Sequence, residues 1–189
     1  MNKHTFESHI TFHGSVAKAI DAFNSMPVDD RQGDRLVAFV QLDGDGERIY
    51  SEAMTVGLIK NVTSGEAVDI LLERAAVYLR YGLVPLRLKL EVDGRAPFLG
   101  ALYPEQHMRV YCPQRKRDDF FAWAKASRLK VSQKLDYLDP RNPDLYYLLN
   151  RTTVDAKAGG LPPGVLFLNQ EQEWVTYDTA PYIDTRWVL

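Results

Sequence analysis

The segment TFESHITF, residues 5–12, alternates between apolar and polar side chains as a half-buried β-strand does. One side of this strand carries large apolar groups with a single serine among them: Phe6, Ser8, Ile10 and Phe12. The other side carries a carboxylate, an imidazole and a hydroxyl: Glu7, His9 and Thr11. We therefore expect one face of the strand to be buried and the other face to hold the polar groups of a site.

The first half of the chain alternates strands and helices in the order βαββαβ. Ser15 is a candidate N-cap for a first helix, and Pro27 ends the helical spacing of apolar residues that follows it. Thr63 and Glu66 form a candidate capping box for a second helix, which Gly82 closes. After the strand at 5–12, further strands are predicted at 35–42, 49–59 and 85–92. This order is that of the ferredoxin-like unit.

The second half of the chain repeats features of the first. Glu105 and His107 stand 98 residues after Glu7 and His9, and a stretch rich in glycine and proline stands where a second helix would follow. We predict an α+β protein of tandem duplicated ferredoxin-like (βαββαβ) repeats, the second repeat lacking most of its second helix. A chance match of short patterns is the alternative. The predicted repeats form one compact unit and span residues 1–92 and 103–189, with a connection at 93–102.

Composition limits the classes of protein to which the chain can belong. Its 189 residues, 46% of them hydrophobic, can bury a sizeable core. With 23 basic and 25 acidic residues the net charge is −2, which gives no global field to attract duplex DNA or an anionic membrane. Cys112 is the single cysteine, and no apolar run is long enough to span a membrane. These features predict a cytoplasmic protein without a membrane or duplex DNA as partner.

Polar residues of both predicted repeats would gather on the open faces of their sheets. Two further strands add these polar groups to those of residues 5–12: Arg87, Lys89, Glu91, Glu105, His107 and Arg109. If the two faces meet, His9 and His107 approach each other across a cleft between the repeats. The alternative is a solvated sheet face whose charges pair across neighbouring strands.

The sequence HITF, residues 9–12, resembles the H-x-T/S-hydrophobic strand motif of the two-histidine phosphoesterases, whose two lobes each contribute one such strand to a central cleft. In that family the paired histidines act as general base and acid on a phosphodiester, and the hydroxyls help to hold the phosphate. The resemblance implies catalytic roles for His9 and His107 and phosphate binding by Thr11. The second motif departs from the family pattern, because Arg109 replaces the expected hydroxyl. Arginine binds phosphate through bidentate hydrogen bonds, but this chemistry differs from that of a hydroxyl. The resemblance therefore leaves the cyclic-phosphate mechanism open.

These observations predict binding or hydrolysis of a phosphate-containing small molecule or nucleotide end in the cleft between the repeats. The phosphate-binding groups are then Thr11, Arg87, Lys89 and Arg109. The supporting carboxylates are Glu7, Glu91 and Glu105. The alternative function is a non-enzymatic module that uses its open sheet faces for contact with a protein partner or RNA.

Two further resemblances concern the strands themselves. The patterns E-S-H-x-T and R-x-K-x-E are similar to those of a group of uncharacterised small bacterial and viral proteins. The alternation of Arg, Lys and Glu on strands is also similar to the interior of the triphosphate-tunnel enzymes, which bind nucleoside triphosphates with a divalent metal. The opening E-x-E-x-K of those enzymes is absent here, so we rank nucleoside triphosphates below phosphodiesters.

No cofactor and no metal ligand are predicted. Carboxylate and imidazole groups together suit zinc or manganese, and such groups occur here at Glu7, His9, Glu105 and His107. The two pairs are far apart in the sequence, however, and the chain contains neither HExxH nor CxxC. A divalent cation is therefore the less favoured alternative.

Overall fold

The structure, a computed structural model, describes residues 2–43, 45–94, 97–135, 144–151 and 160–181. The first half contains β1 (His4–Phe12), α1 (Val16–Ser25), β2 (Arg35–Leu42), β3 (Arg48–Val62), α2 (Ser64–Arg80) and β4 (Pro85–Asp93). The second half contains β5 (Tyr103–Tyr111), α3 (Arg117–Ala126), β6 (Lys130–Lys134), β7 (Leu145–Asn150) and β8 (Leu166–Asp178). Short 3₁₀ turns lie at Asp29–Arg31 and Gln114–Lys116. In the described ranges, no helix has both the length and the apolar character needed to cross a membrane.

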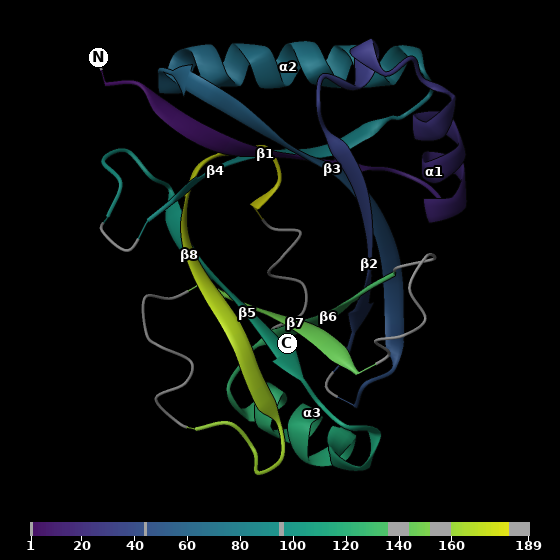
Figure 1. Ribbon diagram of the computed structural model, residues 1–189, viewed down its shortest axis with the longest axis vertical. Coiled ribbons are helices and arrows are strands. Elements are labelled where there is room, and N and C mark those ends of the chain that lie inside the picture. The colour runs from purple at the N-terminus through teal and green to yellow at the C-terminus, as the bar shows by residue number, and fades with distance from the viewer. Residues whose placement is uncertain (1, 44, 95–96, 136–143, 152–159, 182–189) are drawn as a thin grey trace.

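The eight strands pair edge to edge in one closed antiparallel barrel (Figure 1). Their order around the barrel is β1-β3-β2-β6-β7-β5-β8-β4, and pairing between β4 and β1 completes the ring. Each half of the chain contributes four adjacent strands in the same relative order. The β2–β6 and β4–β8 pairs join the two halves. Because every one of these strands has a neighbour on both sides, none of them is left as an exposed sheet edge.

The closed barrel shows that the predicted fold class is wrong. An α+β protein of tandem duplicated ferredoxin-like repeats has two sheets with separate open faces, and the two-lobed, phosphoesterase-like layout needs the same arrangement. Instead, the two sets of four strands are joined at both edges. The predicted cleft between repeats is therefore replaced by the interior of one barrel. The stretch between β7 and β8, where the second repeat was expected to lack a helix, lies partly outside the described residues.

The helices cover the outside of the barrel at two places (Figure 1). Helices α1 and α2 pack against strands of the first half, and α3 contacts β6 in the second half. Phe6, Ile10 and Phe12 lie in the apolar core under α1 and α2, as the alternation in residues 5–12 predicts. A second apolar core, around Met108, lies on the α3 side. Because the outward side chains of the strands fill these two cores, the inward side chains are left to line the barrel.

A buried ion pair fixes α2 to the barrel wall. Arg74 of α2 pairs with the carboxylate of Asp34, and its guanidinium donates hydrogen bonds of 3.1 Å each to Ser8 Oγ and to the Leu58 carbonyl. Gly57 allows this close approach, because a Cβ at that position would lie 1.7 Å from Asp34 Oδ1. The outward side of β1 is thereby held against α2, and the polar side of β1 is turned into the barrel.

Candidate functional site

The inward side chains of β1 and β4 form paired rows of polar groups across the two strands. In the antiparallel register, Glu7 lies opposite Glu91, His9 opposite Lys89, and Thr11 opposite Arg87. His9 is 9% exposed and Thr11 is 6% exposed. The expectation of an open face on β1 is therefore wrong, and so is the alternative of a solvated face, because closure of the barrel encloses these side chains.

Glu91 is the centre of an ion network in the barrel interior. Its side chain is fully buried, and its carboxylate oxygens lie 2.6 Å from His9 Nε2 and 2.7 Å from Lys89 Nζ. His107 Nε2 lies 3.9 Å from the same carboxylate. None of these contacts has hydrogen-bond geometry, so neither oxygen accepts a hydrogen bond from the described residues. Burial alone would raise the pKa of Glu91, but the charges of Lys89 and His9 hold this pKa well below its usual value.

His9 is held between two carboxylates. Its Nε2 lies 3.3 Å from Glu7 as well as 2.6 Å from Glu91. Burial lowers the pKa of the imidazole, but Glu91 and Glu7 together outweigh burial and raise the pKa of His9 to about 9. In this arrangement His9 is a cation at neutral pH.

His107 reaches the same carboxylate network from β5. Its Nε2 lies 3.0 Å from Glu173 and 3.5 Å from Glu105, in addition to its contact with Glu91. Burial lowers the pKa of His107, but Glu105, Glu173 and Glu91 raise this pKa well above its usual value. The two predicted catalytic histidines therefore face one shared carboxylate.

A second group of ion pairs lies beside the first. Arg87 donates hydrogen bonds of 2.9 Å and 2.6 Å to Asp178, and the Tyr103 hydroxyl donates to the same carboxylate. Burial would raise the pKa of Asp178, but the hydrogen bonds from Arg87 and Tyr103 lower this pKa below its usual value. Arg151 lies 3.8 Å from Asp178 and 3.3 Å from Glu105. Because Glu105 also pairs with Lys89 at 2.8 Å, the two groups form one network.

A cavity of about 110 Å³ opens beside this network. Five basic side chains from four strands line it: His9, Arg87, Lys89, His107 and Lys130. Hydroxyl groups are supplied by Thr11, Ser132 and Tyr147. Among the described lining residues, the one carboxylate is that of Glu52, which accepts a 2.7 Å hydrogen bond from Gln41. The face that a bound molecule meets is therefore rich in hydrogen-bond donors.

The structure brings most of the predicted site residues to this one place. The five that line the cavity are His9, Thr11, Arg87, Lys89 and His107. The fully buried Glu91 and Glu105 lie against Lys89, and the half-buried Glu7 lies against His9. Arg109 is different, because it is exposed and does not line the cavity, and its guanidinium lies 5.5 Å from the centre of the Tyr147 ring.

Several residues of the site were not predicted from the sequence. They are Glu52, Lys130, Arg151, Glu173 and Asp178. The alternation in β8 is a signal that could have placed Glu173 on the inward face, opposite Glu105. No comparable pattern marks Arg151, which directly follows β7. Its side chain lies near Asp178 because strand pairing brings together parts of the chain that are distant in the sequence.

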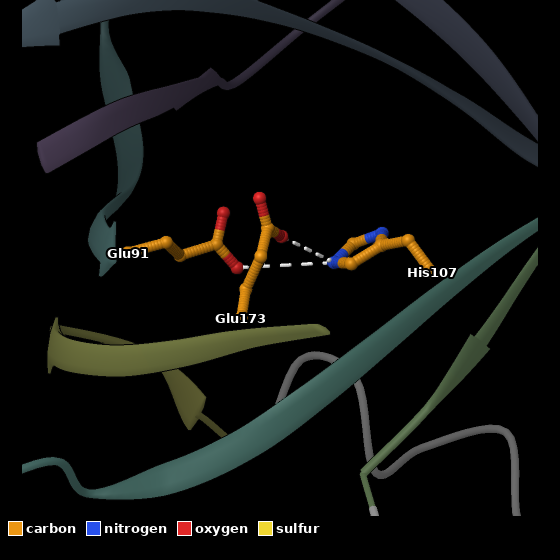
Figure 2. Close-up of side chains that lie close together, drawn as sticks. All are labelled: Glu91, His107 and Glu173. Atoms are coloured by element: carbon orange, nitrogen blue, oxygen red, sulfur yellow. Dashed lines mark ion pairs between the residues drawn. The ribbon is translucent and has the colours of Figure 1, made fainter. Parts of the chain in front are cut away.

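Three side chains in the network are arranged so that they could hold a metal ion (Figure 2). Glu91, His107 and Glu173 each offer a ligand atom, and these atoms all lie within 4.8 Å of one another. This group differs from the four residues considered in the sequence as metal ligands, of which His107 is the one shared member.

Comparisons with known proteins assign the chain to no family. No family model matches it, and no curated protein matches it. Among solved structures, a protein from Lactobacillus acidophilus NCFM, described provisionally as a monooxygenase, matches 94% of this chain and 96% of its own. That match has 10% sequence identity and a TM-score of 0.32. A similarity this low carries no argument about fold or function.

Proposed function

We propose that the cavity inside the barrel binds the phosphate group of a small molecule or nucleotide end. The observation that carries this proposal is the lining, to which the described residues contribute five basic side chains and one carboxylate, that of Glu52. Hydrogen bonds from charged donors to phosphate oxygens are shorter and stronger than those between neutral groups. A site enclosed by the barrel strengthens such interactions further, because water is partly excluded.

The buried carboxylates support this arrangement by holding the basic groups in place. Glu91 and Glu105 pair with Lys89, and Asp178 pairs with Arg87. These pairs prevent the large destabilisation that an unpaired buried charge would cause. An entering anion would therefore meet donors whose orientation is already fixed, so little reorganisation is needed on binding.

The volume of the cavity restricts which part of a ligand enters it. A cavity of roughly 150 Å³ is known to hold one benzene molecule, so about 110 Å³ accommodates a phosphate group but not a whole nucleotide. The rest of a larger ligand would lie outside the cavity. The alternation of Arg, Lys and Glu on the strands is similar to the interior of the triphosphate-tunnel enzymes. Pyrophosphate and nucleoside triphosphates are therefore candidate ligands, together with cyclic phosphodiesters.

Hydrolysis of the bound phosphoester is the second part of the proposal. His9 and His107 line the same cavity from β1 and β5. Because the pKa of each imidazole is raised, both would act on a bound phosphoester near neutral pH as proton donors rather than as general bases. The alternative function, a module that binds protein or RNA through open sheet faces, needs the polar face of β1 to be accessible. That face is enclosed by the barrel, and we do not favour this alternative.

Isothermal titration calorimetry of the chelator-treated protein with pyrophosphate tests binding. Lys130→Gln removes one positive charge from the cavity lining, and Arg109→Gln removes one from outside it. A charge-assisted hydrogen bond contributes about 1.5–3 kcal/mol, so Lys130→Gln should weaken binding about tenfold or more. Arg109→Gln should change the affinity by less than about threefold, as exposed charges contribute little. Absence of binding by the wild-type chain, or equal losses in the two variants, would refute the proposal.

A further inference from the structure

We infer that Glu91, His107 and Glu173 form a binding site for one divalent cation inside the barrel. The three residues come from β4, β5 and β8. Figure 2 shows the carboxylates of Glu91 and Glu173 converging on the same nitrogen of the His107 ring. This inference goes beyond phosphate binding and does not depend on it.

The spacing of the candidate ligand atoms fits coordination of a single ion. His107 Nε2 lies 3.0 Å from Glu173 Oε2 and 3.9 Å from Glu91 Oε1. Bonds of about 2.0–2.2 Å from nitrogen and oxygen to zinc place neighbouring ligand atoms roughly 3–3.5 Å apart. The candidate ligand atoms all lie within 4.8 Å of one another, so the two carboxylates have to move toward the ion to reach this spacing.

Buried polar atoms without hydrogen bonds are the second observation that points to a ligand. The side chain of Glu91 is fully buried, and its contacts with His9 and Lys89 are close in distance but lack hydrogen-bond geometry. Nε2 of His107 also makes no hydrogen bond with the described residues. Most buried polar atoms in proteins have such a partner. These atoms have ion-pair partners but no hydrogen bond of good geometry, and a cation between them would offer coordination in place of such bonds.

The charges of the network are compatible with a bound cation. The ion pairs described above connect five carboxylates: Glu7, Glu91, Glu105, Glu173 and Asp178. They also connect three side chains that are cationic whatever the state of the histidines: Arg87, Lys89 and Arg151. His9, a cation at neutral pH in this arrangement, adds a fourth positive charge. The described groups therefore carry one excess negative charge when His107 is neutral, as a metal ligand must be, and a divalent cation would offset it. A proton on His107 would offset it as well, so the experiment has to separate these two cases.

The donor set favours a transition-metal ion over magnesium or calcium. One imidazole nitrogen with two carboxylates suits zinc or manganese, whereas magnesium and calcium prefer oxygen ligands alone. Lys89 is the internal competitor of such an ion, because its Nζ lies 2.7 Å from Glu91 Oε1. Its second partner, Glu105 at 2.8 Å, keeps Lys89 paired when the ion takes Glu91.

Calorimetric titration of the chelator-treated protein with zinc chloride, and separately with manganese chloride, tests this site in the absence of phosphate. We expect one ion per chain from at least one of the two metals. Glu173→Gln removes a charged ligand and preserves side-chain shape, and it should lower the affinity about tenfold or more. Glu171→Gln is the matched control, because Glu171 lies on the same strand but is exposed and outside the cluster. The affinity of the Glu171→Gln variant for the metal ion should stay within about twofold of the wild-type affinity.

The inference would be refuted if a metal ion bound the Glu173→Gln variant as tightly as the wild type. It would also be refuted if neither metal bound the wild-type chain. Anomalous diffraction from crystals grown with zinc provides a measurement that does not depend on variants. A peak between Glu91, His107 and Glu173 is expected, and a peak elsewhere or no peak contradicts the inference. Because these titrations contain no phosphate and the pyrophosphate titrations contain no metal, each proposal can fail without the other.

Discussion

Replacement of Asp178 by asparagine should destabilise the barrel, because it removes the counter-charge of a buried arginine. Asp178 has a side chain with no exposed surface and accepts two hydrogen bonds from Arg87, whose side chain is 8% exposed. It also accepts hydrogen bonds from the Tyr103 hydroxyl and from the Ala180 amide at 3.0 Å. Asparagine keeps one oxygen acceptor but carries no charge, so the ionic part of the Arg87–Asp178 interaction is lost.

The size of the effect follows from the burial of this pair. Removing one partner of a buried ion pair costs about 3–5 kcal/mol, and the acceptor retained by asparagine places the expected value near the lower limit, about 3 kcal/mol. For a chain of this length each kcal/mol lowers Tm by about 2–4 °C, so Asp178→Asn should lower Tm by about 6–12 °C. Asp45→Asn is the matched control, because Asp45 forms an exposed pair with Lys125 at 3.7 Å. That pair contributes about 0–1 kcal/mol.

The dependence on pH gives this prediction a second test. The pKa of Asp178 is lowered in the folded chain, so its ionised form stabilises the fold at pH values above its ordinary pKa of 3.8. That contribution is lost as the pH falls through the lowered pKa. Urea unfolding should therefore show a large difference between wild type and Asp178→Asn near neutral pH and a shrinking difference in acid. Equal stability of the two chains at neutral pH would refute the role of this pair.

Two further predictions concern close packing outside the cavity. Gly57→Ala should lower the urea unfolding midpoint by an amount equivalent to about 3 kcal/mol or more. The new Cβ would lie 1.7 Å from Asp34 Oδ1 and would displace the Asp34–Arg74 pair. A midpoint near that of the wild type would contradict this prediction. Cys112 should react slowly with a maleimide in the native chain and rapidly in urea, because its side chain is buried and burial raises the pKa of its thiol to about 11; rapid native labelling would show that the thiol is accessible.

Side-chain alternation predicted which residues share a face of a strand, but not whether that face is open or enclosed inside the barrel. His9 and Thr11 on β1, with Arg87 and Lys89 on β4, line one cavity because alternation is a local property of each strand. Closure of the barrel depends on the β2–β6 and β4–β8 pairs, whose partners are distant in the chain. A local pattern does not specify such pairs, so the face was predicted to be open.

Arg109 and Asp178 illustrate the same limit at the level of single residues. Arg109 shares its strand with His107, yet it is exposed against Tyr147 and lies outside the cavity lining, because alternation gives the face of a strand but not the position along the barrel. Asp178 holds Arg87 in place from the end of β8. Neither position follows from spacing in the sequence, since both are set by how far each strand extends along its neighbour.

The central claim is that phosphate binds inside the barrel, and a crystal structure of the chain grown with pyrophosphate tests it most directly. The account predicts density for the anion in the cavity, in contact with His9, Arg87 and His107. An empty cavity in crystals that contain the anion, or anion density confined to the outer surface, would contradict it.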